Sequence, residues 1–389
     1  MDPDLSALDT FLDEREADGY LIDASSEQSD QLYLSGFDAH DPFFTLYTGE
    51  THLLVSGLEY GRATKEARAE TVSRYADYDY QYGPPDERIR MLADFLADHD
   101  VSTVLAPARF PLATADGLRD REVTIEAETE DVLTEIRAVK TSEEVEHIRE
   151  AQRANEAAMA AAEELLRAAS AEDGSLLLDG ETLTSERVTR EIEMALLEHD
   201  HALSETIVAG GEQGADPHDR GSGPLPANEP IVIDVFPRSK ETNYNADMTR
   251  TFVVGEPTEE ARRRYELTEQ ALDAALSAIE PGATGADVHD AACDVYEEAG
   301  YATLRSDPGT EVGFIHSTGH GIGLDVHELP SLSPSGGELE PGHVITVEPG
   351  LYDPAVGGMR IEDLVVVTEE GYENLTDYPI ALEPTVRER

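Results

Sequence analysis

Four acidic residues in the C-terminal part of the chain lie inside or beside runs of apolar, strand-forming residues, and they constrain the fold more than any other feature. They are Asp234, Asp247, Glu348 and Glu362, which adjoin the runs 231–233, 248–254, 344–347 and 364–367. A carboxylate buried among apolar side chains is costly unless it is paired with a cation or coordinates a metal ion. The chain must therefore fold so that these four carboxylates meet positive charge.

Nearby basic side chains cannot supply that charge, since only Arg250 and Arg360 lie beside these acids in the sequence. A histidine- and glycine-rich segment, His316-Ser-Thr-Gly-His320-Gly-Ile-Gly323, offers imidazole ligands and lets the backbone approach a metal closely. Carboxylates combined with one imidazole suit Mn²⁺ first, with Co²⁺, Fe²⁺ or Zn²⁺ as alternatives. We therefore expect two divalent ions, which shared carboxylates can hold about 3.5–4 Å apart.

The hydrophobic patterns divide the chain into two parts, residues 1–132 and 133–389. In the first part, strand patterns alternate with helical ones, and the residues Gly49-Glu50 between two strand patterns indicate a hairpin. This alternation predicts a small α/β domain. The strand patterns lie at 19–22, 43–47, 51–55 and 101–105, and the helical ones at 5–12 and 89–99.

The second part begins with a long helix, because Thr141-Ser-Glu-Glu144 fits a capping box. Helical patterns then mix with strand patterns, which predicts an α+β domain with a largely antiparallel sheet. Segment 172–181 contains Gly174 and Gly180 and is expected to be a loop. The further helical patterns lie at 185–198, 258–279 and 285–299, and the strand patterns at 206–209, 231–233, 251–254, 344–347 and 364–367.

Five motifs follow one another in the second part: Asp234, Asp247-Met-Thr-Arg-Thr251, His316-Ser-Thr-Gly-His-Gly-Ile-Gly323, Val347-Glu-Pro-Gly350 and Arg360-Ile-Glu-Asp363. With these motifs, residues from about 135 to 380 resemble the pita-bread metallopeptidases, which include prolidase, aminopeptidase P and methionine aminopeptidase. All five ligands of that family occur here in the family's order. The separate N-terminal part resembles the prolidase, aminopeptidase P and creatinase branch. The resemblance implies a C-terminal pita-bread domain, like those of creatinase and the aminopeptidases, behind a smaller creatinase-like N-terminal α/β domain.

The resemblance assigns a role to each of the five ligands. It implies that Asp234 chelates one metal, that Asp247 and Glu362 bridge both, and that His320 and Glu348 hold the second metal. One departure from the family lies between the two aspartates, whose spacing (247 − 234 = 13) exceeds the usual one by two residues. Because strand side chains alternate with a period of two, an insertion of two residues at a turn preserves their facing.

Further residues acquire catalytic or substrate-binding roles from the same resemblance. Glu348 is expected to take a proton from the attacking water as well as binding metal. His218 is expected to pass a proton or to steady the leaving amine, and His327 to stabilise the substrate carbonyl or oxyanion. His316 is expected to face the substrate. Two more residues complete the expected site: Arg360, which we expect to orient Glu362 from the same strand face, and Tyr352, which we expect to line the pocket.

The expected activity is that of an Xaa-Pro dipeptidase or Xaa-Pro aminopeptidase, which hydrolyses a Pro-containing peptide through a metal-bridging hydroxide. A hydrolase of a non-peptide amide or of a compatible solute such as ectoine is an alternative within the same fold. A pita-bread protein that only binds a partner is a second alternative, and the complete ligand set argues against it. The resemblance also implies a homodimer.

The charge of the whole chain indicates the salt environment in which the protein works and the partners that it does not bind. There are 83 acidic residues against 28 basic ones, a formal net charge of −55, and the acids are spread evenly. Such a surface repels itself unless salt screens it, which predicts a high-salt cytoplasm of a halophilic organism rather than a merely acidic protein. Direct nucleic-acid binding is excluded by the lack of a basic footprint. No apolar run of membrane-spanning length occurs, and Cys293 is expected to be a small core residue.

Overall fold

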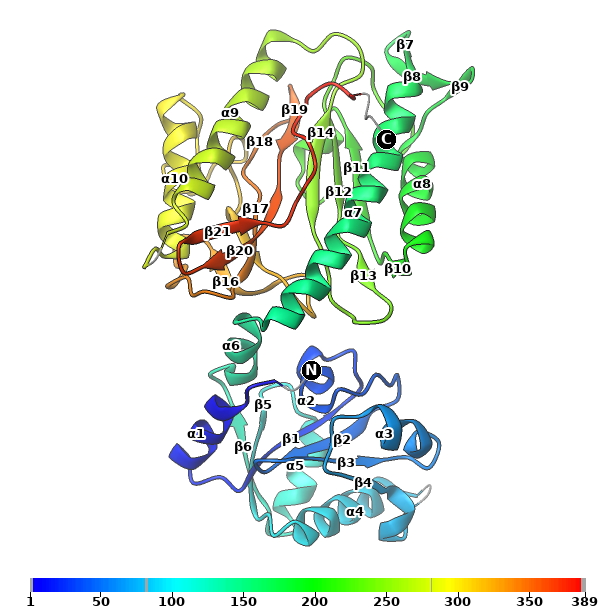
Figure 1. Cartoon of the computed structure of the whole chain (residues 1–389), viewed down its shortest axis with the longest axis vertical. Helices are drawn as coiled ribbons and strands as arrows, with labels where there is room; N and C mark the ends of the chain where they lie inside the picture. The colour runs from blue at the N-terminus through cyan, green and yellow to red at the C-terminus, as the bar shows by residue number, and fades with distance from the viewer. Residues whose placement is uncertain (1–2, 81–82, 281, 386–389) are drawn as a thin grey trace. The chain divides into compact units, whose positions relative to one another are not determined.

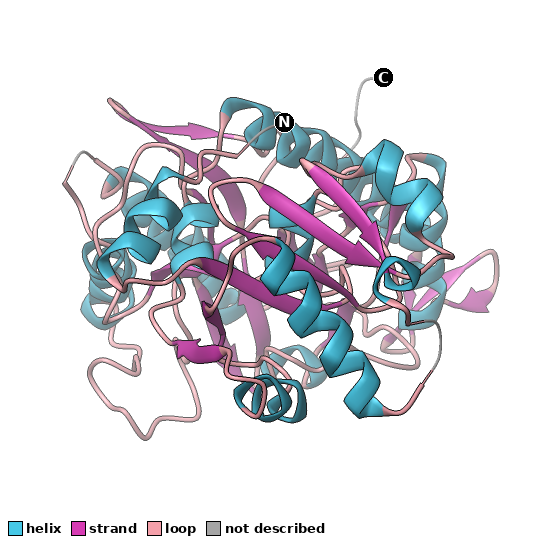
Figure 2. Cartoon of the chain, turned by 90° about the horizontal axis from the view of Figure 1, so that it is seen from below, coloured by secondary structure: helices cyan, strands magenta, loops and turns pink. Residues whose placement is uncertain are grey.

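The computed structural model describes residues 3–80, 83–280 and 282–385, in which helices and strands are interspersed (Figure 2). The chain divides into two compact units, residues 1–137 and 138–389. Within the described ranges, no helix combines the length and apolar character needed to cross a membrane.

The first unit is built on one six-stranded sheet with the strand order β4-β3-β2-β1-β5-β6. The hairpin predicted around Gly49 is confirmed, because β2 and β3 pair antiparallel with Tyr47 opposite Thr51. The later strands β5 and β6 join in parallel, as strands connected through a helix do. The elements are α1 (Ser6–Glu14), β1 (Gly19–Ala24), α2 (Ser29–Ser35), β2 (Phe43–Tyr47), β3 (Thr51–Val55), α3 (Tyr60–Glu66), β4 (Thr71–Arg74), η1 (Tyr75–Tyr78), α4 (Pro85–Asp98), β5 (Thr103–Pro107), α5 (Leu112–Arg119), β6 (Thr124–Glu128) and α6 (Val132–Ala138).

The second unit contains two main antiparallel sheets, each covered by a pair of helices (Figure 1). This arrangement confirms the predicted α+β fold with antiparallel pairing. Its elements are α7 (Ser142–Ala168), β7 (Ser170–Glu172), β8 (Ser175–Leu178), β9 (Glu181–Thr182), α8 (Ser185–Glu198), β10 (His201–Ala202), β11 (Thr206–Gly210), η2 (Gln213–Ala215), β12 (Ile231–Val235), β13 (Arg238–Ser239), β14 (Met248–Phe252), α9 (Glu259–Ser277), α10 (Gly285–Glu298), β15 (Gly319–Gly321), β16 (Glu328–Leu332), β17 (Val344–Val347), β18 (Gly350–Asp353), β19 (Gly357–Arg360), β20 (Asp363–Thr368) and β21 (Gly371–Asn374).

The first of the two sheets has the order β11-β12-β14 and packs against α7 and α8. Helix α7 begins with the predicted capping box, in which the Thr141 side chain accepts from the Glu144 N–H and Glu144 reaches back. Its buried face carries small residues such as Ala154, Ala158 and Ala162, which let the helix lie close to the strands. Helix α8 occupies the predicted range, because Thr184 caps its first turn.

The second sheet has the order β16-β15-β17-β20-β21 and packs against α9 and α10. Both helices begin at a capping threonine, Thr258 and Thr284, whose side chains accept backbone N–H groups of the first turn. Cys293 is fully buried within this core, as the sequence predicted. The helices thus pack against the apolar faces of the two sheets, and the opposite faces of the strands remain for polar side chains.

One local prediction was wrong. Residues 172–181 form no simple loop but most of a small three-stranded sheet, β7-β8-β9. Its two turns are Asp173-Gly174 and Asp179-Gly180, and all four of these residues have positive φ. That conformation is typical of two-residue hairpin turns, which favour Asp-Gly. The glycines marked turns between short strands rather than an irregular segment.

Candidate metal centre

The two aspartates come from neighbouring strands of the first sheet. Asp234 lies in β12 opposite Thr249 of β14, and Asp247 immediately precedes β14. Because alternate residues of a strand share a face, Asp247 and Thr249 lie on the side of the sheet that also carries Asp234. The longer connection between the aspartates folds into β13 and a turn, closed by the bridge between Arg238 and Asn245. The two extra residues therefore leave the facing of both aspartates intact.

The other three predicted ligands come from the second sheet. His320 lies in β15, Glu348 follows β17, and Glu362 immediately precedes β20. The Nε2 atom of His320 lies 3.5 Å from Glu348 Oε1 and 3.8 Å from Asp247 Oδ2. Asp247, His320 and Glu362 each offer a ligand atom within 4.8 Å of those of the other two. The structure thus brings ligand candidates from both sheets to one place.

The polar atoms at this place fit a bound cation. The Nδ1 atom of His320 lies 3.1 Å from the carbonyl oxygen of Gly321, so Nδ1 carries the proton and Nε2 presents a lone pair to the carboxylates. Three buried carboxylate oxygens, Asp234 Oδ1, Asp247 Oδ1 and Glu362 Oε1, lack a hydrogen-bond partner among the described residues. Because these carboxylate oxygens and the His320 lone pair are all hydrogen-bond acceptors, they cannot satisfy one another, and a cation between them would stabilise the buried site.

Burial and mutual repulsion raise the pKa of the clustered acids. Burial, then Glu362 and Asp234, raise the pKa of Asp247 well above its usual range. Burial also raises the pKa of Glu362 strongly, with Glu348 adding to the effect, and it raises that of Glu348 to about 7. Burial lowers the pKa of His320 to about 3, so this imidazole is neutral. A neutral histidine among carboxylates that repel one another is the electrostatic setting of a metal site.

Arg360 reaches Glu362 through an intermediate residue, and its direct carboxylate partner is another acid. It was expected to orient Glu362 from the same strand face, but β19 ends at Arg360 and Glu362 lies beyond that end. The Nη2 atom of Arg360 instead donates to Asp234 Oδ2 at 2.5 Å, and its Nε donates to Thr249 Oγ1 at 3.1 Å. The Thr249 hydroxyl in turn donates to Glu362 Oε2 at 2.8 Å. Arg360 therefore holds one expected ligand, Asp234, directly and reaches another, Glu362, through Thr249.

Thr249 was not singled out from the sequence. Its position two residues after Asp247 was the available signal, because strand alternation places the two side chains on one face. Its hydroxyl is fully buried and links Arg360 to Glu362.

Tyr352 and His316 continue this chain of hydrogen bonds. Arg360 Nη1 donates to the Tyr352 hydroxyl at 2.9 Å, and that hydroxyl lies 2.9 Å from His316 Nε2. The His316 Nδ1 lies 2.6 Å from the Ser317 carbonyl oxygen, so it donates and leaves Nε2 to accept from Tyr352. Tyr352 was expected to line the pocket, but its side chain is fully buried behind His316 and Arg360. Its contacts fix those two residues.

A cavity of about 880 Å³ opens onto the clustered carboxylates. His218, His316 and His327 line it together with the five expected metal ligands and Arg360. The ring of His327 meets that of His320 edge-on, with 4.2 Å between the ring centroids. His218 is exposed in the turn that follows Asp216, whose side chain accepts the His218 N–H. Histidines predicted from separate motifs therefore share one cavity with the acids.

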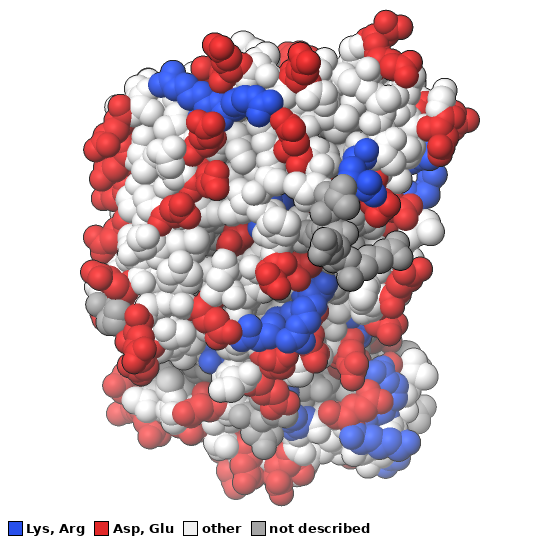
Figure 3. All heavy atoms as spheres, turned by 45° about the horizontal axis from the view of Figure 1, so that its top comes forward, with Lys and Arg blue, Asp and Glu red and all other residues white. Residues whose placement is uncertain are grey.

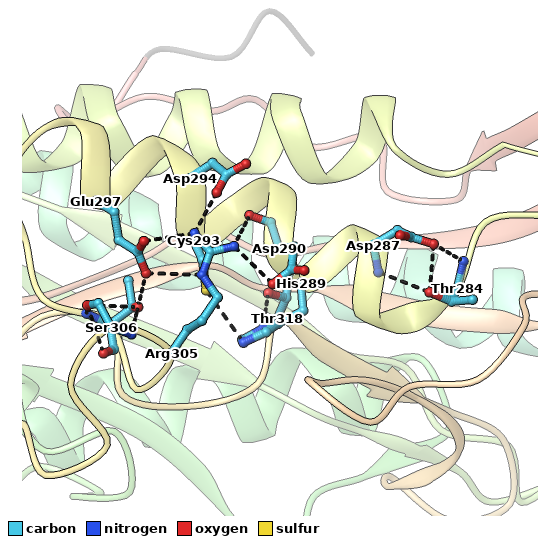
Figure 4. A network of polar contacts seen from close by, with 11 residues as sticks. Thr284, Asp287, His289, Asp290, Cys293, Asp294, Glu297, Arg305, Ser306 and Thr318 are labelled. Carbon is cyan, nitrogen blue, oxygen red and sulfur yellow. Dashed lines mark hydrogen bonds and ion pairs between the residues drawn. The ribbon is translucent and has the colours of Figure 1, made fainter.

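Polar contacts of α10 with the loop that follows it and with Thr318 support the segment that carries His320 (Figure 4). His289 of α10 lies 2.9 Å from the Thr318 hydroxyl, and the Thr318 carbonyl accepts the Glu348 N–H at 2.7 Å. No motif in the sequence marked His289, whose ring contacts the segment that leads into His320 and that bonds to the backbone of Glu348. Arg305 fastens the following loop to the same helix through Asp290, Asp294 and Glu297.

The whole chain matches known proteins. Residues 146–369 match metallopeptidase family M24, and residues 5–151 match the creatinase/prolidase N-terminal domain. The Xaa-Pro dipeptidase of Pyrococcus furiosus is 30% identical over 377 residues, which cover 96% of this chain and 97% of that protein.

Solved structures agree with the sequence matches. The prolidase from Pyrococcus horikoshii has a TM-score of 0.80 and 27% identity, over 97% of this chain and 99% of that one. The X-Pro aminopeptidase from Thermotoga maritima has a TM-score of 0.79 and 27% identity, over 95% of this chain and 99% of that one. The predicted pita-bread fold with a creatinase-type N-terminal domain is thereby confirmed. The chain belongs to metallopeptidase family M24.

Proposed function

We propose that this chain is a metallo-exopeptidase that hydrolyses Xaa-Pro bonds. The observation that carries the proposal is the convergence, in one cavity, of four carboxylates and a neutral histidine. Three oxygens of these carboxylates are buried and lack a hydrogen-bond partner among the described residues. The match along almost the full length of an Xaa-Pro dipeptidase, together with the likeness to prolidase and X-Pro aminopeptidase structures, supports the choice of substrate.

The residues present suit a pair of divalent ions. Asp234, Asp247, His320, Glu348 and Glu362 would hold them, with Asp247 and Glu362 as the shared ligands. Ions bound there would polarise the scissile carbonyl and make a water molecule acidic near neutral pH. We propose Mn²⁺ as the working metal, because four of the five ligands offer hard oxygen donors.

The protein's own side chains perform the remaining tasks. Glu348, whose pKa burial raises to about 7, can accept the proton of the attacking water and return it to the leaving nitrogen. His327 and His218 face the cavity, where the first can donate to the developing oxyanion and the second can steady the departing amine. His316 accepts from Tyr352, so it presents a neutral ring to the substrate with its orientation fixed. Arg360 keeps Asp234 in place.

The setting of the enzyme is also a proposal. Acidic side chains are spread over the face drawn in Figure 3, and the basic ones there are fewer. Together with the net charge of −55, this distribution supports work in a high-salt cytoplasm. The family resemblance supports a homodimer, which light scattering in molar KCl would detect.

A substrate panel tests the proposal. Chelator-treated protein in molar KCl is assayed with and without Mn²⁺ or Co²⁺ on Xaa-Pro dipeptides, longer Xaa-Pro peptides, Met-Ala peptides and N-acylated solutes. We expect hydrolysis of Xaa-Pro substrates that depends on added metal. Full activity in metal-free protein contradicts the metal assignment, and a preference for N-acylated solutes replaces the peptidase assignment with the amide-hydrolase alternative.

A further inference from the structure

The cavity wall carries an ion pair that the mechanism does not use. Arg220 and Glu205 contact each other through their side chains, and both line the cavity that contains the metal ligands. Each side chain is 51% exposed. Exposed ion pairs of this kind contribute roughly 0–1 kcal/mol, so stability alone gives little reason for the pair.

The strand register places this pair close to the metal ligands. Ile207 of β11 is directly opposite Asp234 of β12, and Glu205 immediately precedes β11, two residues before Ile207. Arg220 is fixed on the other edge of β11, because its carbonyl accepts the Val208 N–H at 3.0 Å.

The backbone beside Arg220 holds it against that strand. Gly221 has a φ of +75°, and a Cβ on it would come within 1.8 Å of the Val208 carbonyl oxygen. This close approach, which only glycine permits, keeps the arginine at the cavity wall.

Arg220 is the basic residue of the cavity that can serve a substrate. Among the described residues that line it, Arg220 and Arg360 are the only lysines or arginines, against five acids. Arg360 is buried and occupied by Asp234, Tyr352 and Thr249. A guanidinium has five N–H donors, so Arg220 can bind a second carboxylate beside Glu205.

We propose that Arg220 binds the C-terminal carboxylate of an Xaa-Pro dipeptide, which makes the enzyme a dipeptidase rather than an aminopeptidase for long peptides. The assignment rests on the proposed Xaa-Pro activity. In such a dipeptide the carboxylate is three bonds from the scissile carbon, roughly 4 Å away, and the long arginine side chain can reach it. Ile207 and Phe236, which also line this wall, suit the apolar proline ring. A longer peptide has a neutral amide at that point.

The test compares Leu-Pro, Leu-Pro-amide and Leu-Pro-Gly with wild type, Arg220→Met and Arg220→Lys, all loaded with Mn²⁺ in molar KCl. We expect wild type to prefer Leu-Pro. Arg220→Met should lower kcat/KM for Leu-Pro roughly 10- to 100-fold, mainly through KM, and leave the amide nearly unchanged. Arg220→Lys should keep part of the preference. Arg167→Met is the matched control, since Arg167 forms an exposed ion pair with Glu164 and does not line the cavity.

The outcomes separate this assignment from the proposed function. An equal loss on acid and amide in Arg220→Met, or an unchanged ratio between them, overturns the assignment of Arg220. Wild-type protein that cleaves Leu-Pro-amide and Leu-Pro-Gly as well as Leu-Pro also overturns it and leaves the Xaa-Pro activity standing. Wild-type protein that cleaves none of the three overturns the proposed function, and the assignment with it.

Discussion

The ion pair between Lys140 and Glu328 is buried, so its contribution to stability should far exceed that of an exposed pair. The Lys140 Nζ lies 3.0 Å from Glu328 Oε2, and both side chains are 1% exposed. The other oxygen of Glu328 accepts the Asp325 N–H at 2.8 Å. The pair therefore anchors the turn that presents His327 to the cavity.

Replacing Lys140 with Met should destabilise the protein by roughly 3–5 kcal/mol, because it removes a buried positive charge that lies against the buried Glu328 carboxylate. Met fills the volume of the lysine stem, so the loss reflects charge rather than a cavity. The exposed pair of Arg167 and Glu164 is the control, and Arg167→Met should cost no more than about 1 kcal/mol.

Urea unfolding in molar KCl, followed by far-UV circular dichroism, measures these changes. The double variant with Lys140→Met and Glu328→Gln should recover much of the loss, since the glutamine oxygen still accepts the Asp325 N–H and no charge remains buried. A loss from Lys140→Met as small as that from Arg167→Met would show that the Lys140–Glu328 pair contributes no more than an exposed pair. If the changes in unfolding free energy of the two single variants added up to that of the double variant, Lys140 and Glu328 would not be coupled.

Three further predictions concern the metal centre and the surface. Glu348→Ala should lower kcat by roughly 10²–10⁴ or more while the protein stays folded, because a proton acceptor is lost; near-normal turnover contradicts the role of Glu348. Tyr352→Phe should lower the free energy of unfolding in urea by roughly 1–3 kcal/mol and also lower kcat/KM, because Arg360 loses a buried acceptor. If both values are unchanged, the hydrogen bonds that link His316 to Asp234 contribute neither to stability nor to activity. Stability should rise with KCl into the molar range, since the Debye length shrinks from about 10 Å at 0.1 M to 3 Å at 1 M; salt-independent unfolding contradicts a surface limited by self-repulsion.

Local signals predicted the secondary structure wherever they were strong. The capping box at Thr141 and the periodic pattern of 185–198 gave helices that the structure confirms, because both signals act within one or two turns. The small sheet around Asp173-Gly174 was missed, since its strands are only two to four residues long and leave almost no periodic pattern. The Asp-Gly turns were the better guide there.

The site was predictable as a set of residues and less so as a set of contacts. The five expected ligands share one cavity. The four acids lie within or next to apolar strand runs that the sequence marked, and His320 was marked by its glycine-rich segment. The partner of Arg360 could not be inferred, since it depends on which strands meet across two sheets. Sequence spacing pointed to Glu362, two residues away, but the ion pair goes to Asp234, 126 residues away. His289 escaped notice for the same reason.

The expected ligands come from both sheets of the second unit, and this division has a thermodynamic consequence. Asp234 and Asp247 belong to one sheet, and His320, Glu348 and Glu362 to the other, so ions held by all five would act as a cross-link between distant parts of the chain. A ligand that binds only the native state stabilises it by mass action, about 2.7 kcal/mol at a concentration one hundred times its Kd. The supply of free metal would then govern the lifetime of the folded protein as well as its turnover.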